Sequence, residues 1–189
     1  MPSNWIKPSH WIKHDLKPWQ TGLQWLWVTL IFLIIDQATK QYAVAYFTEV
    51  GVYETVEVMP YFNFILRYNT GAAFSFLADQ DGWQVFFFGA IAASVSAVLL
   101  IWLYSLPAKN RWLSIALCLI IAGALGNLYD RIMLGKVVDF IDWYYGDYHW
   151  PAFNIADSVI MLGAVMMLLD GFFGSDAENS EQKAGASHN

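Results

Sequence analysis

Charged residues are scarce in this sequence. Lysine, arginine, aspartate and glutamate make up 14% of the 189 residues, whereas hydrophobic residues make up 57%. This composition is too apolar for an ordinary soluble domain of the same length. The ten lysines and arginines form no basic stretch, so nothing indicates binding to nucleic acid. The sequence therefore predicts a small membrane protein that forms one compact bundle.

Cysteine is nearly absent as well. Cys118 is the only one, so a disulfide within the chain is excluded. It lies in the middle of an apolar run, where the expected role is that of a small hydrophobic side chain packed in a helix.

Four segments are long and apolar enough to cross a bilayer of about 30 Å as helices. They cover residues 23–47, 83–103, 112–134 and 152–173. Residues 52–58 instead alternate like a strand, and residues 62–68 form a second β-rich run, which predicts a small hairpin. Because an open sheet edge cannot lie in lipid, we expect the hairpin at the membrane surface. The predicted fold is a polytopic α-helical membrane protein with four transmembrane helices and a small β-rich extracytoplasmic subdomain between the first two helices.

The chain divides into three parts on this interpretation. Residues 1–21 form an interfacial leader, residues 22–173 form the membrane domain with a β-rich insertion at about 49–82, and residues 174–189 form a polar tail that we expect to be disordered. Four spans place both termini on one side of the membrane. Lysine and arginine are somewhat more frequent on that side, which favours a cytoplasmic location for both termini.

Ionisable and amide side chains gather where the predicted helices meet the outer face. These residues are Asp36 and Lys40 in the first helix, Asn127, Asp130 and Arg131 in the third, Asn154 and Asp157 in the fourth, and Asn69 and Asp139 in the outer connections. Ionisable groups are costly and rare at membrane depth, so a cluster of this kind predicts a functional site.

Each of these residues also has a purely structural interpretation. Asn154 followed by Asp157 is typical of a helix start, and Asp130 beside Arg131 is typical of an interfacial ion pair. Asn69 suits a turn. Asp142, among aromatic residues, is interpreted as a solvated loop group. Helix capping does not, however, require all the carboxylates to gather at one end of the bundle, which favours a shared site.

Four motifs carry a resemblance to a known family. They are DQATK at 36–40, RYNTGAAFSFL at 67–77, GALGNLYDRIMLGKVVDFID at 123–142 and FNIADSVI at 153–160. In this order they resemble the successive motifs of the lipoprotein signal peptidases, or signal peptidase II. The resemblance implies that Asp139 and Asp157 are the catalytic pair. It also implies that Asn69, Asn127, Arg131 and Asn154 shape the substrate site, with Asp36, Lys40 and Asp130 as a supporting shell.

The function implied by the resemblance is that of a membrane aspartic endopeptidase. Such an enzyme removes the signal peptide from diacylglyceryl-modified prolipoproteins and cleaves before the lipidated cysteine, near the outer face of the bacterial inner membrane. The expected partners are the prolipoprotein and membrane lipid, with no cofactor or metal, and the chain is expected to act as a monomer. Two neighbouring carboxylates that share one proton can activate water and protonate the leaving nitrogen. Which aspartate starts protonated stays open, because the proton belongs to the pair.

Two other functions remain as alternatives. A metal-dependent lipid phosphotransferase would use Asp130, Asp139 and Asp142 to hold magnesium. A proton or ion pathway would use buried groups such as Asp36 as relays, but it predicts polar residues through the full depth of the bundle. The inner halves of the last three helices are almost entirely apolar, which disfavours the pathway.

Overall fold

The computed structural model describes residues 17–71 and 83–186. Most of the predicted leader, and residues 72–82 of the predicted β-rich insertion, lie outside the described residues. Two short 3-10 helices, η3 (Pro18–Gln20) and η4 (Gly22–Trp25), precede α1 (Leu26–Val50). The other helices are α2 (Trp83–Ser105), α3 (Arg111–Leu134) and α4 (Ile155–Ala186). Within these described residues, four helical segments are long and apolar enough to span a membrane, as the sequence predicted.

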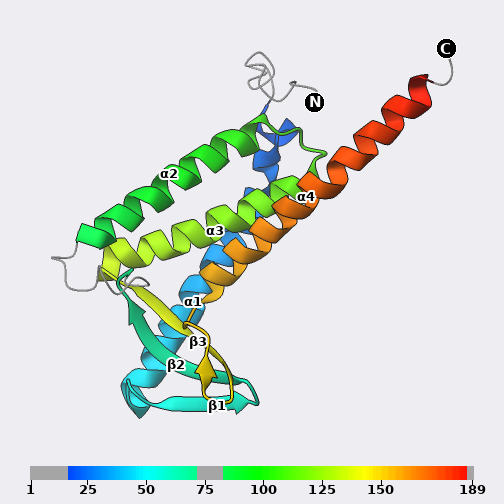
Figure 1. Cartoon of the computed structure of the whole chain (residues 1–189). Helices are drawn as coiled ribbons and strands as arrows, with labels where there is room; N and C mark the ends of the chain where they lie inside the picture. The colour runs from blue at the N-terminus through cyan, green and yellow to red at the C-terminus, as the bar shows by residue number, and fades with distance from the viewer. Residues whose placement is uncertain (1–16, 72–82, 187–189) are drawn as a thin grey trace.

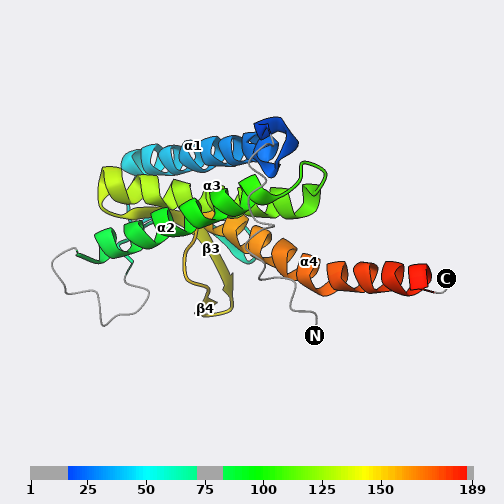
Figure 2. The same cartoon turned by 90° about the horizontal axis from the view of Figure 1, so that it is seen from above.

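Helix α3 is the centre of the bundle. It packs against each of the other three helices (Figure 1), and Figure 2 shows it flanked by α1 on one side and by α2 and α4 on the other. In the most apolar stretch of α3, 67% of the residues are buried, whereas the corresponding share in the other three spans is 22% or less. The outer helices therefore leave most of their apolar surface facing outward, as helices in contact with lipid do.

Two glycines allow the helices to approach α3 closely. A Cβ added at Gly123 would lie 2.2 Å from the carbonyl oxygen of Ala156 in α4. A Cβ at Gly126 would lie 2.6 Å from the Asp36 carboxylate of α1. Small residues at these positions bring the backbones together, as is common between membrane helices. The first turn of α4 and the middle of α1 thereby meet on one side of α3.

A four-stranded antiparallel sheet lies at one end of the bundle (Figure 1). Its strands β1 (Thr55–Met59), β2 (Phe62–Asn69), β3 (Val137–Tyr145) and β4 (Tyr148–His149) follow each other in order. The predicted hairpin is confirmed as β1 and β2. Strands β3 and β4 were not predicted, because this part of the chain was interpreted as a linker. Side chains of β2 and β3 pack on Phe47 near the end of α1, so the sheet is fixed to the bundle.

Helix α4 is longer than predicted. We expected it to end near Phe173 and to be followed by a disordered tail, whereas the structure continues the helix to Ala186. Alanine, glutamate, glutamine and lysine in this segment all have high helix propensity, which the interpretation based on polarity did not weigh. The extension leads away from the sheet, so α4 ends on the side of the bundle where η3 begins (Figure 1).

Candidate active site

The start of α4 is closed by a reciprocal pair of hydrogen bonds. The backbone N–H of Asp157 donates to Oδ1 of Asn154 over 3.0 Å, and the backbone N–H of Asn154 donates to Oδ2 of Asp157 over 3.3 Å. This is the arrangement of a capping box. The helix-start interpretation of these residues is therefore confirmed. It is also compatible with a site, since Oδ1 of Asp157 and the amide nitrogen of Asn154 stay free for other partners.

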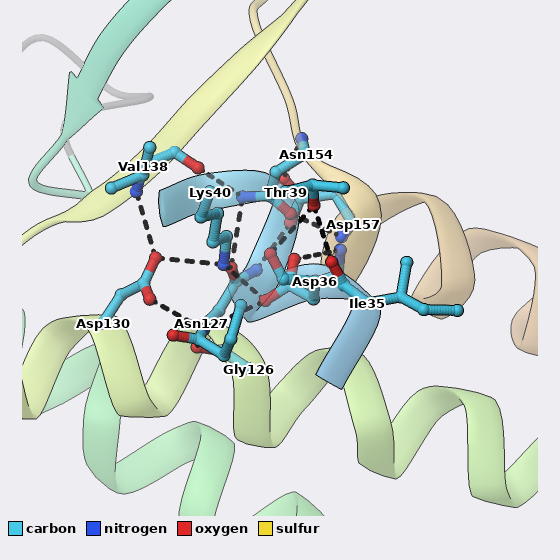
Figure 3. A network of polar contacts seen from close by, with 12 residues as sticks. Ile35, Asp36, Thr39, Lys40, Gly126, Asn127, Asp130, Val138, Asn154 and Asp157 are labelled. Atoms are coloured by element: carbon cyan, nitrogen blue, oxygen red, sulfur yellow. Dashed lines mark hydrogen bonds and ion pairs between the residues drawn. The ribbon is translucent and has the colours of Figure 1, made fainter. Parts of the chain in front are cut away.

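The amide of Asn154 links the start of α4 to β3. Its Nδ2 donates to Oδ1 of Asp139 over 2.7 Å, and it also lies within hydrogen-bond distance of Val138 O and Asn127 Oδ1. Asn127, from α3, donates its own Nδ2 to Oδ1 of Asp157 over 2.7 Å. The two asparagines thus connect Asp139 and Asp157, which come from different elements (Figure 3 shows the cluster around Asn127, Asn154 and Asp157).

Asp139 has a second amide partner from β2. Nδ2 of Asn69 donates to Oδ2 of Asp139 over 3.1 Å, while Oδ1 of Asn69 accepts the N–H of Gly71 over 2.8 Å. Asn69 therefore forms the turn that its sequence context suggested and points its amide at Asp139 at the same time. The side chain of Asp139 is almost fully enclosed, since the residue is 2% exposed. Its carboxylate is held by an amide on each oxygen.

The environment of Asp139 favours its protonated form. Burial, and after it the negative charge of Asp157, raise the pKa of Asp139 to about 7, although the bonds from Asn69 and Asn154 lower it. Two carboxylates in a shared enclosed site resist ionising together. Below a pH of about 7, Asp139 is therefore mostly protonated.

A buried lysine stands behind the asparagines. Nζ of Lys40 contacts Asp36 Oδ2 at 2.8 Å, Asp130 Oδ2 at 3.0 Å and Asn127 Oδ1 at 2.9 Å. Three acceptors match the three N–H donors of an ammonium group. Lys40, Asp36 and Asp130 are each 2% exposed or less, so these charges are paired away from water.

The two carboxylates of this ion network, from Asp36 and Asp130, also accept hydrogen bonds from backbone N–H groups. Oδ1 of Asp36 accepts the N–H of Ala156 over 2.8 Å, and Oδ2 of Asp130 accepts the N–H of Val138 over 3.1 Å. Ala156 directly precedes Asp157 and Val138 directly precedes Asp139. The network therefore fixes the two segments that carry the paired aspartates (Figure 3).

Arg131 lies at the edge of the cluster. Its Nη1 donates to the backbone oxygen of Asn127 over 3.1 Å, and its guanidinium lies 5.7 Å from the ring centre of Phe88 in α2. The alternative interpretation of Asp130 and Arg131 as an ion pair with each other does not apply, because Asp130 pairs with Lys40. Adjacent residues of a helix do not face each other, which explains why the two side chains separate.

Comparison with known proteins decides the family. A model of the family described as signal peptidase (SPase) II matches residues 28–173. The chain belongs to the signal peptidase II family. It is 49% identical over 156 residues to the lipoprotein signal peptidase of Photorhabdus laumondii, which covers 82% of this chain and 92% of that protein. It is also 51% identical over 153 residues to the lipoprotein signal peptidase of Aeromonas hydrophila, with 81% and 90% covered.

Solved structures agree with this assignment. A protein described as a bacterial membrane enzyme, solved by the in meso method at 2.3 Å resolution, superposes with a TM-score of 0.66 at 32% identity. The likeness covers 80% of this chain and 88% of that one. A second such structure, at 1.9 Å resolution, gives a TM-score of 0.63 at 33% identity over 75% of this chain and 88% of that one. As a signal peptidase II, the chain is a multi-pass membrane protein and an aspartic peptidase.

One polar residue of this signal peptidase was missed by sequence reasoning. Nε2 of Gln37 donates to Oδ1 of Asp130 over 2.9 Å and also lies near Asp36 Oδ2 and Gly126 O. It therefore bridges α1 and α3 beside the ion network. The signal was present, because Gln37 lies three residues before Lys40, a helical spacing that places both on one side of α1.

Asp142 was interpreted as solvated, and this is wrong. It is 6% exposed, accepts from Asn63 Nδ2 over 2.8 Å and contacts Nδ1 of His149 at 2.9 Å. The register of β2 and β3 sets Asn63 opposite Asp142, which only the unpredicted β3 makes possible. Asp130, Asp139 and Asp142 therefore each have separate partners. Within the described part of the peptidase, no three metal-ligating side chains come together.

Proposed function

We propose that Asp139 and Asp157 are the catalytic aspartates of an endopeptidase that removes the signal peptide from diacylglyceryl-modified prolipoproteins. The observation that carries this proposal is the geometry of the pair. Two carboxylates from different elements share a bridge of asparagine amides, and the pKa of one of them lies at about 7. The relatives named above are lipoprotein signal peptidases, which supports a prolipoprotein as the substrate. The bond before the lipidated cysteine is the one that the resemblance in the four motifs implies.

The pair supplies both proton transfers that peptide hydrolysis needs. The ionised carboxylate takes a proton from a water molecule, and the water oxygen then attacks the scissile carbonyl carbon. The protonated carboxyl group donates a hydrogen bond to the carbonyl oxygen at the same time. The roles then reverse, and the leaving nitrogen receives a proton. Asn127 and Asn154 hold the carboxylates at fixed positions during these steps, since each donates to one of them. Catalysis of this kind requires no covalent intermediate.

The location of the pair suits a substrate that is anchored in the membrane. Asp139 lies in the sheet and Asp157 in the first turn of α4, so the pair lies where the bundle meets the sheet. A lipidated cysteine is held at the bilayer surface by its acyl chains, which places the bond before it at this depth. We propose that this is the outer face and that both termini are cytoplasmic. Both described ends of the chain lie away from the sheet (Figure 1), which supports placing both termini on the membrane face opposite the pair.

Membrane lipid is the proposed neighbour of the outer helices. Large apolar side chains point outward from them, including Leu30, Ile34, Phe86 and Leu168, which are at least 57% exposed. A surface of this kind requires an apolar solvent. The complete cluster of Asp139, Asp157 and their amide partners lies within one chain, which supports the proposal of a monomer.

The test of this function uses the purified full-length protein in detergent. It is incubated with a diacylglyceryl-modified prolipoprotein and with the same chain lacking the lipid, and the products are identified by mass spectrometry. We expect the lipidated chain to be cut directly before the modified cysteine and the unlipidated chain to stay intact. Equal cleavage of both chains would contradict the lipid requirement, and a cut elsewhere would contradict the proposed bond.

A further inference from the structure

A groove lies between the first turns of α2 and the last turns of α3, at the end of the bundle that carries the sheet (Figure 1). Its volume is about 650 Å³. Among the described residues that line it, only Arg131 has a polar side chain. From Val85 to Ala93 the groove follows α2 for about 12 Å. It therefore lies within segments that are apolar enough to span the membrane.

Small residues of α2 keep this groove open. Gly89, Ala90 and Ala93 carry at most a methyl group, and both alanines are exposed. A Cβ added at Gly89 would lie 3.5 Å from the side chain of Leu128, so α2 and α3 are in close contact beneath the groove. An apolar and unbranched occupant suits a slot of this kind.

Phe88 of α2 connects the groove with the proposed catalytic pair. The Arg131 guanidinium lies 5.7 Å from the centre of the Phe88 ring. A Cβ added at Gly71 would lie 2.6 Å from the same ring, so the residues that follow β2 pack on it. The N–H of Gly71 donates to Asn69, whose amide donates to Asp139. A continuous chain of contacts thus leads from the groove to Asp139.

Arg131 has an unused donor at the end of the groove nearest the pair. Its Nη1 donates to the backbone oxygen of Asn127, whereas its Nε is buried and has no hydrogen-bond partner among the described residues. A buried donor without an acceptor is costly, which indicates that a ligand supplies one. The guanidinium also interacts with the charges of Asp157 and Asp139, so this donor lies in the field of the pair.

The occupant therefore needs an apolar body and an oxygen acceptor at the end that lies near the pair. A signal-peptide helix does not meet the second condition, because its backbone carbonyls are bonded within the helix. A fatty acyl ester meets both conditions, since an unbranched methylene chain ends in a carbonyl oxygen. The substrate of the proposed reaction carries two such esters on the residue next to the scissile bond.

We propose that the groove between α2 and α3 binds one acyl chain of the substrate's diacylglyceryl group, and that Arg131 donates to the carbonyl oxygen of its ester. This inference rests on the proposed function and identifies the part of the peptidase that recognises the lipid. An acyl chain gains little when it exchanges lipid for an apolar groove. The bound chain instead orients the modified cysteine, and with it the bond before it, at Asp139 and Asp157.

The first test compares two prolipoproteins that differ only in the lipid, which is dipalmitoylglyceryl or dihexanoylglyceryl. Ala93→Phe fills the part of the groove farthest from the sheet, which a palmitoyl chain reaches and a hexanoyl chain does not. We expect this variant to lower the ratio of kcat/KM for the long-chain to the short-chain substrate by about tenfold, because a displaced chain also displaces the attached bond. Since each ratio is taken within one variant, a general loss of activity cancels.

Ala45→Phe is the matched control, because the exposed Ala45 lines a separate groove of about 400 Å³ between α1 and α3. It should keep the ratio of the unaltered protein. An unchanged ratio in Ala93→Phe would overturn the proposal and leave the groove to membrane phospholipid, and an equal fall in both variants would overturn it as well. Failure of the unaltered protein to cleave the dipalmitoyl substrate would instead contradict the proposed function.

The second test addresses Arg131 with a substrate whose two esters are replaced by ethers, which lack the carbonyl oxygen. The unaltered protein should cleave the ester about tenfold faster in kcat/KM, as for a lost hydrogen bond to a charged group. Arg131→Gln should bring this ratio close to one. A ratio near one in the unaltered protein, or a tenfold ratio that persists in Arg131→Gln, would overturn the proposal. The ratios of Ala93→Phe decide it if Arg131→Gln does not fold.

Discussion

At the scale of single residues, the amides around Asp139 and Asp157 explain how two like charges are tolerated in one enclosed place. Each oxygen of Asp139 accepts from an asparagine, and Asp157 accepts from Asn127 and from the backbone of Asn154. These donors stabilise negative charge, whereas burial and mutual repulsion oppose it. The balance leaves the pKa of Asp139 at about 7, where a carboxyl group can exchange its proton during the reaction.

The first prediction concerns pH. The proposed mechanism needs one proton on the pair, and Asp139 loses its proton as the pH rises through its raised pKa. We expect kcat/KM to fall on the alkaline side, with a midpoint near 7 and about a tenfold loss per further pH unit. Asn69→Ala removes a bond that stabilises the ionised form, so it should move this midpoint to higher pH. A midpoint that moves to lower pH in Asn69→Ala would contradict this account, as would a rate that keeps rising above pH of about 8.

The second prediction concerns the ion network. Lys40→Met would leave Asp36 and Asp130 buried without their cation, which typically costs about 3–5 kcal/mol. We expect a large fall in the unfolding temperature in detergent, and recovery of part of it when Asp130→Asn is added. Lys109→Met, in the loop before α3, should have little effect. An unchanged unfolding temperature in Lys40→Met would show that the network is not needed for the fold.

At the scale of elements, close approach of α3 to its neighbours decides where the aspartates lie. Gly123 is the tightest position, since an added Cβ would meet the Ala156 carbonyl oxygen at 2.2 Å. Ala156 directly precedes Asp157. Any separation of the two helices here therefore displaces Asp157, one of the two proposed catalytic residues, and also weakens the packing.

The third prediction follows from that contact. Gly123→Ala should push α4 away from α3, reduce cleavage by about a hundredfold through misplacement of Asp157, and lower the unfolding temperature. The matched control is Gly171→Ala in α4, where an added Cβ meets nothing within 4 Å. This control should keep both properties, because alanine also favours the helix. Equal effects of the two substitutions would contradict the account.

The sequence predicted the helices and the first hairpin because their signals are local. Long apolar runs define the spans, and alternation followed by a turn defines β1 and β2. Strand β3 escaped prediction because Asp139 and Asp142 interrupt its apolar residues, and their burial depends on partners far away in the chain. Long-range pairing likewise decided that Asp130 binds Lys40 and that Asp142 is enclosed. The gathering of the aspartates and asparagines was predicted, whereas the bonds between them required the fold.

At the scale of the whole molecule, the helix bundle and the sheet have different roles. The helices are long and apolar enough to span the membrane, and the sheet holds Asp139 at one end of the bundle. We propose that residues 22–173 form the peptidase unit, with the end of α4 as an addition on the side away from the sheet. In the proposed orientation, the sheet lies at the outer face of the membrane and both termini lie in the cytoplasm.

The fourth prediction tests that orientation. Asp147 is an exposed residue between β3 and β4. In a Cys118→Ala background, a cysteine introduced by Asp147→Cys should react with a membrane-impermeant thiol reagent added outside spheroplasts. A cysteine introduced by Lys109→Cys, in the loop between α2 and α3, should react only after the membrane is permeabilised. The reverse pattern would contradict the proposed topology.

The most direct test of the catalytic pair is cleavage of a lipidated prolipoprotein by Asp139→Asn and Asp157→Asn, with Asp147→Asn as a matched control. Each catalytic variant should lose about a thousandfold or more in kcat, because a general acid or base is removed while the shape of the side chain is kept. The unfolding temperature should confirm that both variants remain folded, and the control should keep full activity. If either variant, still folded, cleaved as fast as the unaltered protein, Asp139 and Asp157 would not be the catalytic pair.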